Sequence, residues 1–103
     1  ILTLQISEHV KRTGKIEGYP GGEKIAREDF FALKCDIFVP AALELQITKK
    51  EAESLKCKVV VEAANGPTNL EGEAILEKRG IDIVPDILAN SGGVIVSYYE
   101  WLQ

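Results

Sequence analysis

The chain has 103 residues, of which 46% are hydrophobic and 27% charged, a composition typical of one folded domain. Lys and Arg number 12 against 16 Asp and Glu, and the net charge of −4 without any basic run argues against a nucleic-acid partner. No apolar run approaches the roughly 20 residues of a membrane span, and no leader-like segment opens the chain. We therefore expect neither a membrane nor a nucleic acid as partner.

The cysteines and the histidine predict no metal site. Cys35 and Cys57 lie at or beside the start of apolar runs and form no C-x-x-C pair, and His9 is the single histidine. We expect two buried, reduced thiols and a solvated His9 among charged neighbours. Reduced thiols predict a cytoplasmic protein, or one of the mitochondrial matrix if the source is eukaryotic.

The chain opens with a predicted helix. Leu2, Ile6 and Val10 recur every four residues on one face, and Gly14 ends the pattern. Residues 14–23 carry many turn-forming residues and predict a loop.

A short helix is then predicted at residues 27–33, packing Phe30 and Leu33 under the first strand. Three Val- and Ile-rich runs barely alternate with polar residues, as strands covered on both faces do. These predicted strands are residues 35–40, 58–65 and 81–86.

Helical patterns separate the strands. Thr48 and Glu51 have the spacing of a capping box, with Ile47 and Ala52 placed for a hydrophobic staple. Further on, Thr68 and Glu71 repeat the capping-box spacing, and Gly80 supplies the stop after the helical pattern "EAILEKR" (73–79). The alternation of strand and helix predicts an α/β fold with three parallel strands and flanking helices.

The last segment, "SGGVIVSYYEWL", predicts a helix with Ser91 as N-cap. Its Val, Ile and Tyr content suits a strand almost as well. We favour a helix because the preceding strand ends at Pro85 and the sheet needs covering.

Small and amide side chains follow all three strands. Ala41 and Ala42 follow the first, Asn65 the second and Asn90 the third. Ligands of open parallel sheets bind beyond the carboxyl ends of the strands, where small residues allow close approach and amides both donate and accept hydrogen bonds. Ordinary turn chemistry explains any one of these exits equally well.

The same edge lacks acid–base groups. Asp86 is the one carboxylate close by, and a strand-end Asp is more often a helix cap or turn residue. We therefore predict the holding part of a site, with no catalytic residue in this chain.

Three segments carry a family resemblance: "CDIFVPAALELQIT", "VVVEAANGPT" and "IVPDILANSGGVIVSYYEWLQ". They resemble the C-terminal, nucleotide-binding domain of hexameric glutamate dehydrogenases. The resemblance implies a Rossmann-like domain of an enzyme that interconverts L-glutamate with 2-oxoglutarate and ammonia, using NAD or NADP. It also implies a homo-oligomer, a hexamer in the full-length family.

The resemblance implies roles for six residues. Ala41 and Ala42 would line the cofactor groove, and Asn65 and Asn90 would contact the nicotinamide end of the cofactor. For the substrate, Val94 and Ser97 would touch glutamate, with the Ser97 hydroxyl at its side-chain carboxylate. Positions 90, 94 and 97 share one helical face.

Two departures limit the resemblance. The family often has Asn where this chain has Leu45. The glycine-rich fingerprint that cradles the pyrophosphate and the substrate domain with its catalytic lysine and aspartate have no counterpart here. We therefore expect residues 1–103 to form a partial NAD(P)-binding domain without the glycine-rich first βαβ unit, inactive alone.

The resemblance also implies how the last helix packs. We expect its apolar and aromatic side chains to anchor it on the sheet and a neighbouring domain: Ile95, Tyr98, Tyr99 and Trp101. In an isolated fragment we expect Tyr99 and Trp101 to be exposed. The alternative is a non-catalytic α/β module that associates through an exposed sheet edge.

Overall fold

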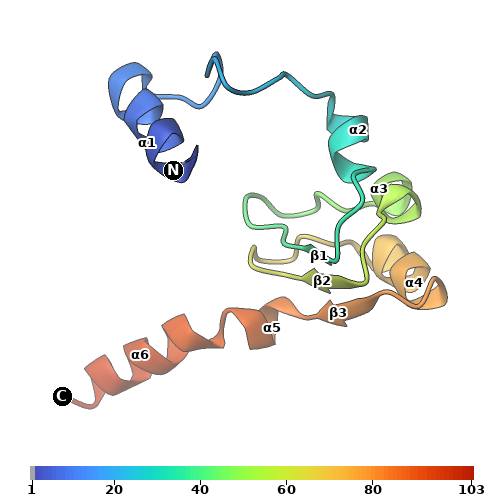
Figure 1. The fold of residues 1–103 in the computed structure, drawn as a ribbon. Helices are drawn as coiled ribbons and strands as arrows, with labels where there is room; N and C mark the ends of the chain where they lie inside the picture. Colours follow the sequence, from blue (N-terminus) through green and yellow to red (C-terminus); the bar gives the residue numbers. More distant parts are fainter. Residues whose placement is uncertain (1) are drawn as a thin grey trace.

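The structure is a computed structural model that describes residues 2–103. Its elements run in chain order as α1 (Leu2–Thr13), α2 (Arg27–Phe31), β1 (Ile37–Phe38), α3 (Lys49–Ser54), β2 (Val59–Val61), α4 (Leu70–Lys78), β3 (Asp82–Val84), α5 (Asp86–Ala89) and α6 (Ser91–Trp101) (Figure 1).

The three strands form one parallel sheet in the order β1-β2-β3, which confirms the predicted α/β class. Ile37 pairs with Val59 and Val60 with Ile83. Each strand is shorter than its predicted apolar run, since the residues at the ends of the run do not pair with the neighbouring strand. The N–H groups of Ala63 and Ala64 donate to the carbonyl of Pro40 and so join two strand exits.

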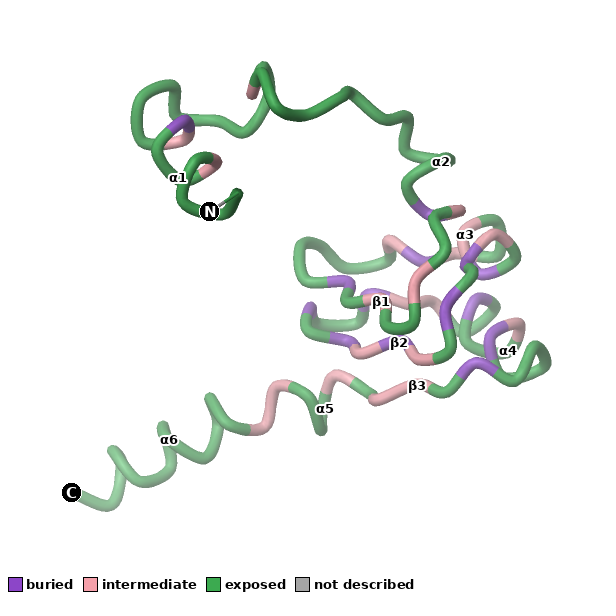
Figure 2. The backbone as a smooth tube through the Cα atoms, viewed as in Figure 1, coloured by how far each residue is buried: buried purple, intermediate pink, exposed green. Residues whose placement is uncertain are grey.

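The core lies between the sheet and the pair of helices α3 and α4, as the buried stretches of Figure 2 show. Five of its side chains are fully buried: Ile47, Ala52, Leu55, Val60 and Leu76. The other face of the sheet is more open, since Ile37 is 59% exposed and Val59 and Val61 are half-buried. The expectation of strands covered on both faces is therefore wrong for the described residues.

The caps are partly as predicted. At α3, the Glu51 carboxylate accepts from the backbone and hydroxyl of Thr48, and Ile47 and Ala52 are both fully buried, which confirms the capping box and the staple.

At α4 the prediction was wrong by one residue. Asn69, not Thr68, is the N-cap, and its side chain accepts from Gly72 N at 2.7 Å. An amide oxygen at 69 reaches the third helical N–H, so Thr68 is left outside the helix. Gly80 ends α4 at φ +73°, a left-handed conformation in which glycine has no steric cost.

The short helix α2 contributes a different aromatic side chain from the predicted one. Phe31 is buried, whereas Phe30 and Leu33 are 47% and 51% exposed. The helix ends at Phe31, so Leu33 falls beyond its last turn. The rings of Phe30 and Phe31 both lie against Phe38 of β1, at 5.9 Å and 5.4 Å between centroids, so Phe30 makes the predicted contact with the first strand but is not buried by it.

Helix α1 stands apart from the sheet, joined by an extended segment at residues 22–26 (Figure 1). His9 is buried here and not solvated as predicted, because the ring of Tyr19 packs edge-on against it at 5.6 Å. Its Nε2 lies 3.3 Å from the carbonyl oxygen of Glu17. The loop after α1 folds back onto the helix, a contact that helical periodicity alone does not reveal.

Helix α6 also projects away from the sheet (Figure 1). The expectation that its aromatic side chains pack on the sheet is wrong in this chain, whereas the exposure expected for Tyr99 and Trp101 in an isolated fragment is confirmed. Its large side chains are each more than half exposed: Val94, Ile95, Val96, Tyr98, Tyr99 and Trp101. The radius of gyration of 16.6 Å exceeds the roughly 13 Å of a compact domain of this length, because both terminal helices extend outward.

Candidate functional site

The candidate site lies where the parallel strands end. All three strands run in one direction, so their exits share an edge of the sheet, as the sequence predicted. Backbone hydrogen bonds hold the exits together: Leu45 N donates to Gly66 O, and Ile47 N donates to Pro67 O. The edge is therefore a connected rim of loops.

A hollow of about 420 Å³ opens between the exits of β2 and β3. Asn65 comes from the first of these exits, Asp86 from the second, and Asn90 and Val94 from the following helices. The structure thus brings together three of the predicted site residues, Asn65, Asn90 and Val94. The size is that of a small-molecule site.

Asp86 is a structural link on the rim. One carboxylate oxygen accepts from Gly66 N at 2.9 Å and the other from Ile87 N at 2.8 Å. Both oxygens therefore hold backbone groups, which confirms a structural role for Asp86, although Pro85 and not Asp86 is the N-cap of α5. The carboxylate positions the rim through these two backbone hydrogen bonds.

Asn90 is half-buried at the junction of α5 and α6. Its Nδ2 lies 3.5 Å from the carbonyl oxygen of Glu62, a long contact that still orients the amide toward β2. Asn90 also takes the cap position of α6 that was predicted for Ser91, whose hydroxyl instead donates to Leu88 O. The short helix α5 shifts the start of α6 by one residue.

Gly92 and Gly93 leave the first turn of α6 open. No atom lies within 4 Å of a Cβ built at either position, and neither glycine has a positive φ. Neither the backbone conformation nor a neighbour in the described chain thus requires glycine there. Two missing side chains beside the hollow suit the close approach of another molecule.

Ala41 and Ala42 line a separate hollow of about 430 Å³ at the exit of β1. Its other walls include Arg27, Phe31 and Gln46. The cofactor residues predicted for one groove therefore fall into two hollows of the same edge.

Ser97 lies one turn beyond Val94 on α6 and is exposed. Its hydroxyl donates to Gly93 O at 3.1 Å. To donate to a bound carboxylate, the Ser97 hydroxyl would have to rotate away from the Gly93 carbonyl. Ser97 is exposed, so the structure leaves room for this rotation.

Glu62 is a rim residue that the sequence reasoning missed. It directly follows β2 and is only 8% exposed. Burial raises the pKa of its carboxyl, and the negative charges of Asp86 and Glu73 raise it further. A glutamate on the same strand face as Val60, two residues earlier, was the available signal, since alternate residues of a strand share a face.

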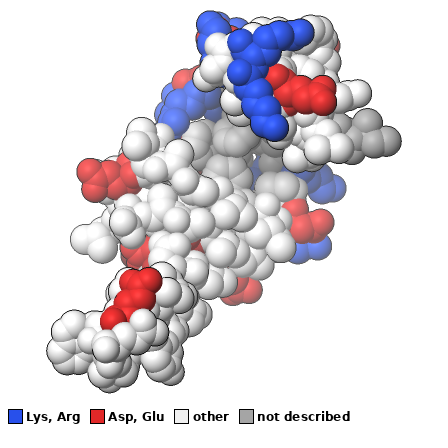
Figure 3. All heavy atoms as spheres, turned by 90° about the vertical axis from the view of Figure 1, so that its left-hand side faces the viewer, with Lys and Arg blue, Asp and Glu red and all other residues white. Residues whose placement is uncertain are grey.

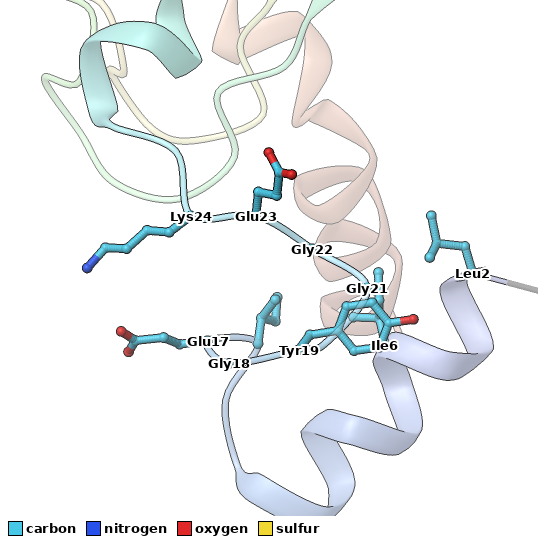
Figure 4. Close-up of a pocket in the computed structure, with 10 residues that line it drawn as sticks. Leu2, Ile6, Glu17, Gly18, Tyr19, Gly21, Gly22, Glu23 and Lys24 are labelled. Carbon is cyan, nitrogen blue, oxygen red and sulfur yellow. The ribbon is translucent and has the colours of Figure 1, made fainter.

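A larger hollow than either of those at the strand exits, about 620 Å³, lies elsewhere, between α1 and the following loop. Leu2, Ile6 and Tyr19 line it, and in Figure 4 Tyr19 lies beside Ile6 while Glu17 and Lys24 extend away from the helix. It is an apolar surface without converging polar groups, so it is a poorer candidate than the rim.

The chemistry of the rim favours holding a ligand. Amide groups, small residues and glycines can approach the flat ring and carboxamide of a nicotinamide, so the residues present fit that group. Within residues 2–103 no cluster of three potential metal ligands occurs. No helix in this part of the chain is long and apolar enough to cross a membrane.

Comparison with known proteins agrees with this geometry. The family model described as Glutamate/Leucine/Phenylalanine/Valine dehydrogenase matches residues 2–103. An NAD-specific glutamate dehydrogenase of Clostridioides difficile is 51% identical over 96 residues, 93% of this chain and 23% of its own length. An NADP-specific glutamate dehydrogenase of Saccharolobus shibatae is 47% identical over 94 residues, 91% of this chain and 22% of its own length.

A solved structure shows the same fold. The hetero-hexameric glutamate dehydrogenase of Thermus thermophilus, in its leucine-bound form, superposes with a TM-score of 0.84 at 33% identity. The match covers 100% of this chain and 24% of that one. The chain therefore spans about a quarter of the length of its relatives. Because the family model covers residues 2–103 and the strand exits carry the matching segments, this chain belongs to the Glutamate/Leucine/Phenylalanine/Valine dehydrogenase family.

Proposed function

We propose that this chain is the part of an NAD- or NADP-dependent glutamate dehydrogenase that holds the nicotinamide end of the cofactor. The parent enzyme deaminates L-glutamate oxidatively to 2-oxoglutarate and ammonia, with hydride transfer to the cofactor. The observation that carries the proposal is the hollow shared by Asn65, Asn90 and Val94 at parallel strand exits. The relatives named as glutamate dehydrogenases support the substrate.

The amide of Asn65 binds the nicotinamide riboside, and Asn90 hydrogen-bonds near the nicotinamide and the reacting carbon. Ala41 and Ala42 line the continuation of the cofactor groove in the neighbouring hollow, where their small side chains leave room. When bound, the cofactor supplies the hydride acceptor. The residues of this chain bind and orient it.

Val94 and Ser97 contact the substrate. Val94 provides apolar surface in the hollow, and the Ser97 hydroxyl binds the side-chain carboxylate of glutamate from the same helical face. A hydroxyl at this place favours glutamate over an apolar amino acid, since a hydroxyl donates a stronger hydrogen bond to a charged carboxylate than to a neutral group, and an apolar side chain offers no acceptor.

Residues 1–103 are the partial cofactor domain of the parent, without the glycine-rich βαβ unit and the substrate domain. We place the parent in the cytoplasm as a homo-oligomer. Helix α6 exposes its large apolar side chains, and Glu100 is the single charged residue of the seventeen at 87–103 (Figure 3). Such an apolar surface supports burial of α6 against other parts of the enzyme.

The test uses Ser97→Ala in the full-length enzyme. We expect a higher KM for glutamate with a smaller change in kcat, because the lost hydrogen bond is made in the ground state as well as in the transition state. Ser54→Ala is the matched control, since Ser54 makes the same bond to the carbonyl four residues back but lies on α3. An unchanged KM for glutamate in Ser97→Ala would refute the role.

A second function has one observation in its favour. Strand β1 is an edge of the sheet, and Ile37 and Val39 beside it are 59% and 51% exposed. An interaction module would associate through this edge. Light scattering on the isolated chain, with Ile37→Lys as the variant, separates the two. Oligomers that dissociate in the variant support the module, and isothermal titration with NADH then measures any cofactor site.

A further inference from the structure

Cys35 and Cys57 occupy opposite positions on neighbouring parallel segments. Ile37 pairs with Val59, and an isolated bridge pairs Lys34 with Lys56, so the offset is 22 residues at both places (59 − 37 and 56 − 34). The same offset sets Cys35 opposite Cys57. Cys35 N also donates to Lys56 O at 3.3 Å, which holds the two segments together at this point.

Both thiols face the core. Cys57 is a member of the buried cluster, and Cys35 is half-buried and packs against that cluster. Opposed residues of parallel strands point to the same face, at a separation of roughly 4.8 Å between backbones. That is within the roughly 4.4–6.8 Å between Cα atoms that a disulfide spans.

The two cysteines differ in access and in environment. Cys35 reaches solvent, whereas burial raises the pKa of the Cys57 thiol and the neighbouring Cys35 raises it further. Exposed lysines flank both thiols at positions 34, 56 and 58, and the Asp36 carboxylate is paired with Lys58 at 2.8 Å. The surroundings therefore attract anionic oxidants to the accessible thiol.

We propose that Cys35 and Cys57 form a reversible disulfide, with Cys35 as the attacking thiol, Cys57 as the resolving thiol and a low-molecular-weight disulfide such as oxidised glutathione as the oxidant. The Cys35 thiolate attacks one sulfur of the oxidant, giving a mixed disulfide and releasing one glutathione thiolate. The Cys57 thiolate then attacks Cys35 Sγ and releases the second glutathione. The two protein thiols lose two electrons and two protons, and the oxidant becomes two molecules of glutathione.

This site lies at the end of the sheet where the strands begin, opposite the rim. It is independent of the proposed dehydrogenase function. Its test reads only the state of the two sulfurs, so its failure leaves the cofactor proposal standing and the converse also holds.

The experiment incubates the native chain with oxidised glutathione, blocks remaining thiols and digests with trypsin without reduction. Cleavage after Lys34, Lys49, Lys56 and Lys58 places the cysteines in peptides 35–49 and 57–58. We expect mass spectrometry to find these two peptides linked, at a rate independent of protein concentration, and to find them separate again after dithiothreitol.

Two variants test the order of attack. In Cys57→Ala the mixed disulfide with glutathione should accumulate on Cys35, because the resolving thiol is absent. In Cys35→Ser the buried Cys57 should remain a free thiol. A linked peptide that forms only in denaturant, chains joined to each other, or a wild-type chain that stops at the mixed disulfide would each overturn the proposal.

Discussion

The carboxylate of Asp86 accepts a hydrogen bond from the backbone N–H of Gly66 at 2.9 Å, across twenty residues of sequence. This contact joins the exit of β3 to the exit of β2, beside the bonds of Val84 and Asn90 to Glu62. Gly66 has a φ of +49°, so the turn it occupies is one that few side chains tolerate. The spacing between Asn65 and Asn90 therefore depends on a residue that itself touches no ligand in the proposed function.

Asp86→Asn should weaken this link. The neutral amide keeps one acceptor oxygen but loses the charge that strengthens both backbone hydrogen bonds, and we expect a loss of about 1–2 kcal/mol in the free energy of unfolding. Urea denaturation followed by circular dichroism measures it. Asp82→Asn, an exposed carboxylate on β3, is the matched control and should change stability little. Equal losses in both variants would contradict the link.

Leu45 has a φ of 52°, in the left-handed region. This conformation is strained for leucine, whose side chain cannot form the local hydrogen bonds that help Asn or Asp adopt it. Its side chain is 59% exposed, so little packing compensates. Leu45→Asn should stabilise the chain by about 1 kcal/mol, because Asn tolerates this conformation. Thermal unfolding checks the gain. Leu43→Asn, in the same loop and 66% exposed without a positive φ, should show none.

Arg79 caps the carboxyl end of α3 from a different helix. Its two terminal nitrogens donate to the carbonyl oxygens of Ala52 and Leu55. Arg79→Met should cost about 1.5–3 kcal/mol, since two carbonyls lose a charged donor, and Arg79→Lys should restore only part because it lacks the planar fork. Denaturant titration compares them with Lys78→Met. A fully rescued Lys variant would show that charge alone matters.

The carboxyl of Glu62 should make stability depend on pH. Burial first, and then Asp86 and Glu73, raise its pKa in the folded chain above the ordinary 4.5. Ionisation is therefore less favourable in the folded than in the unfolded chain. The stability that the neutral carboxyl provides is complete below about pH 4.5 and is lost as the pH rises through the folded pKa.

Glu62→Gln keeps the shape and removes the charge, so it should be more stable than the parent chain at about pH 7 and equal to it at about pH 4. Unfolding midpoints across this range measure the difference. A Glu73→Gln control, at an exposed position, should give a smaller gain at neutral pH. A constant difference at all pH values would mean that packing and not charge separates Glu62→Gln from the parent.

Local pattern determined much of this protein. The positions of the three strands, their parallel order, the capping box at Thr48 and the glycine stop at position 80 all follow from apolar runs and short-range hydrogen bonding. The rim residues could be chosen from sequence for the same reason, since parallel strands must end on one edge. Periodicity and capping act over a few residues, so a single sequence carries them.

Tertiary contacts decided the rest. The burial of His9 depends on Tyr19 folding back onto α1. The division of the rim into two hollows depends on the hydrogen bonds between the loops after the strands. The Glu62 backbone is bonded to Val84 and Asn90, more than twenty residues later in the chain, and its burial likewise requires the folded rim. Helix α6 has large apolar or aromatic side chains at 94–96, 98, 99 and 101, spread around its axis, so its sequence could not say which face, if any, meets the sheet. Such outcomes depend on which surfaces meet across long sequence separations, and no local pattern encodes that choice.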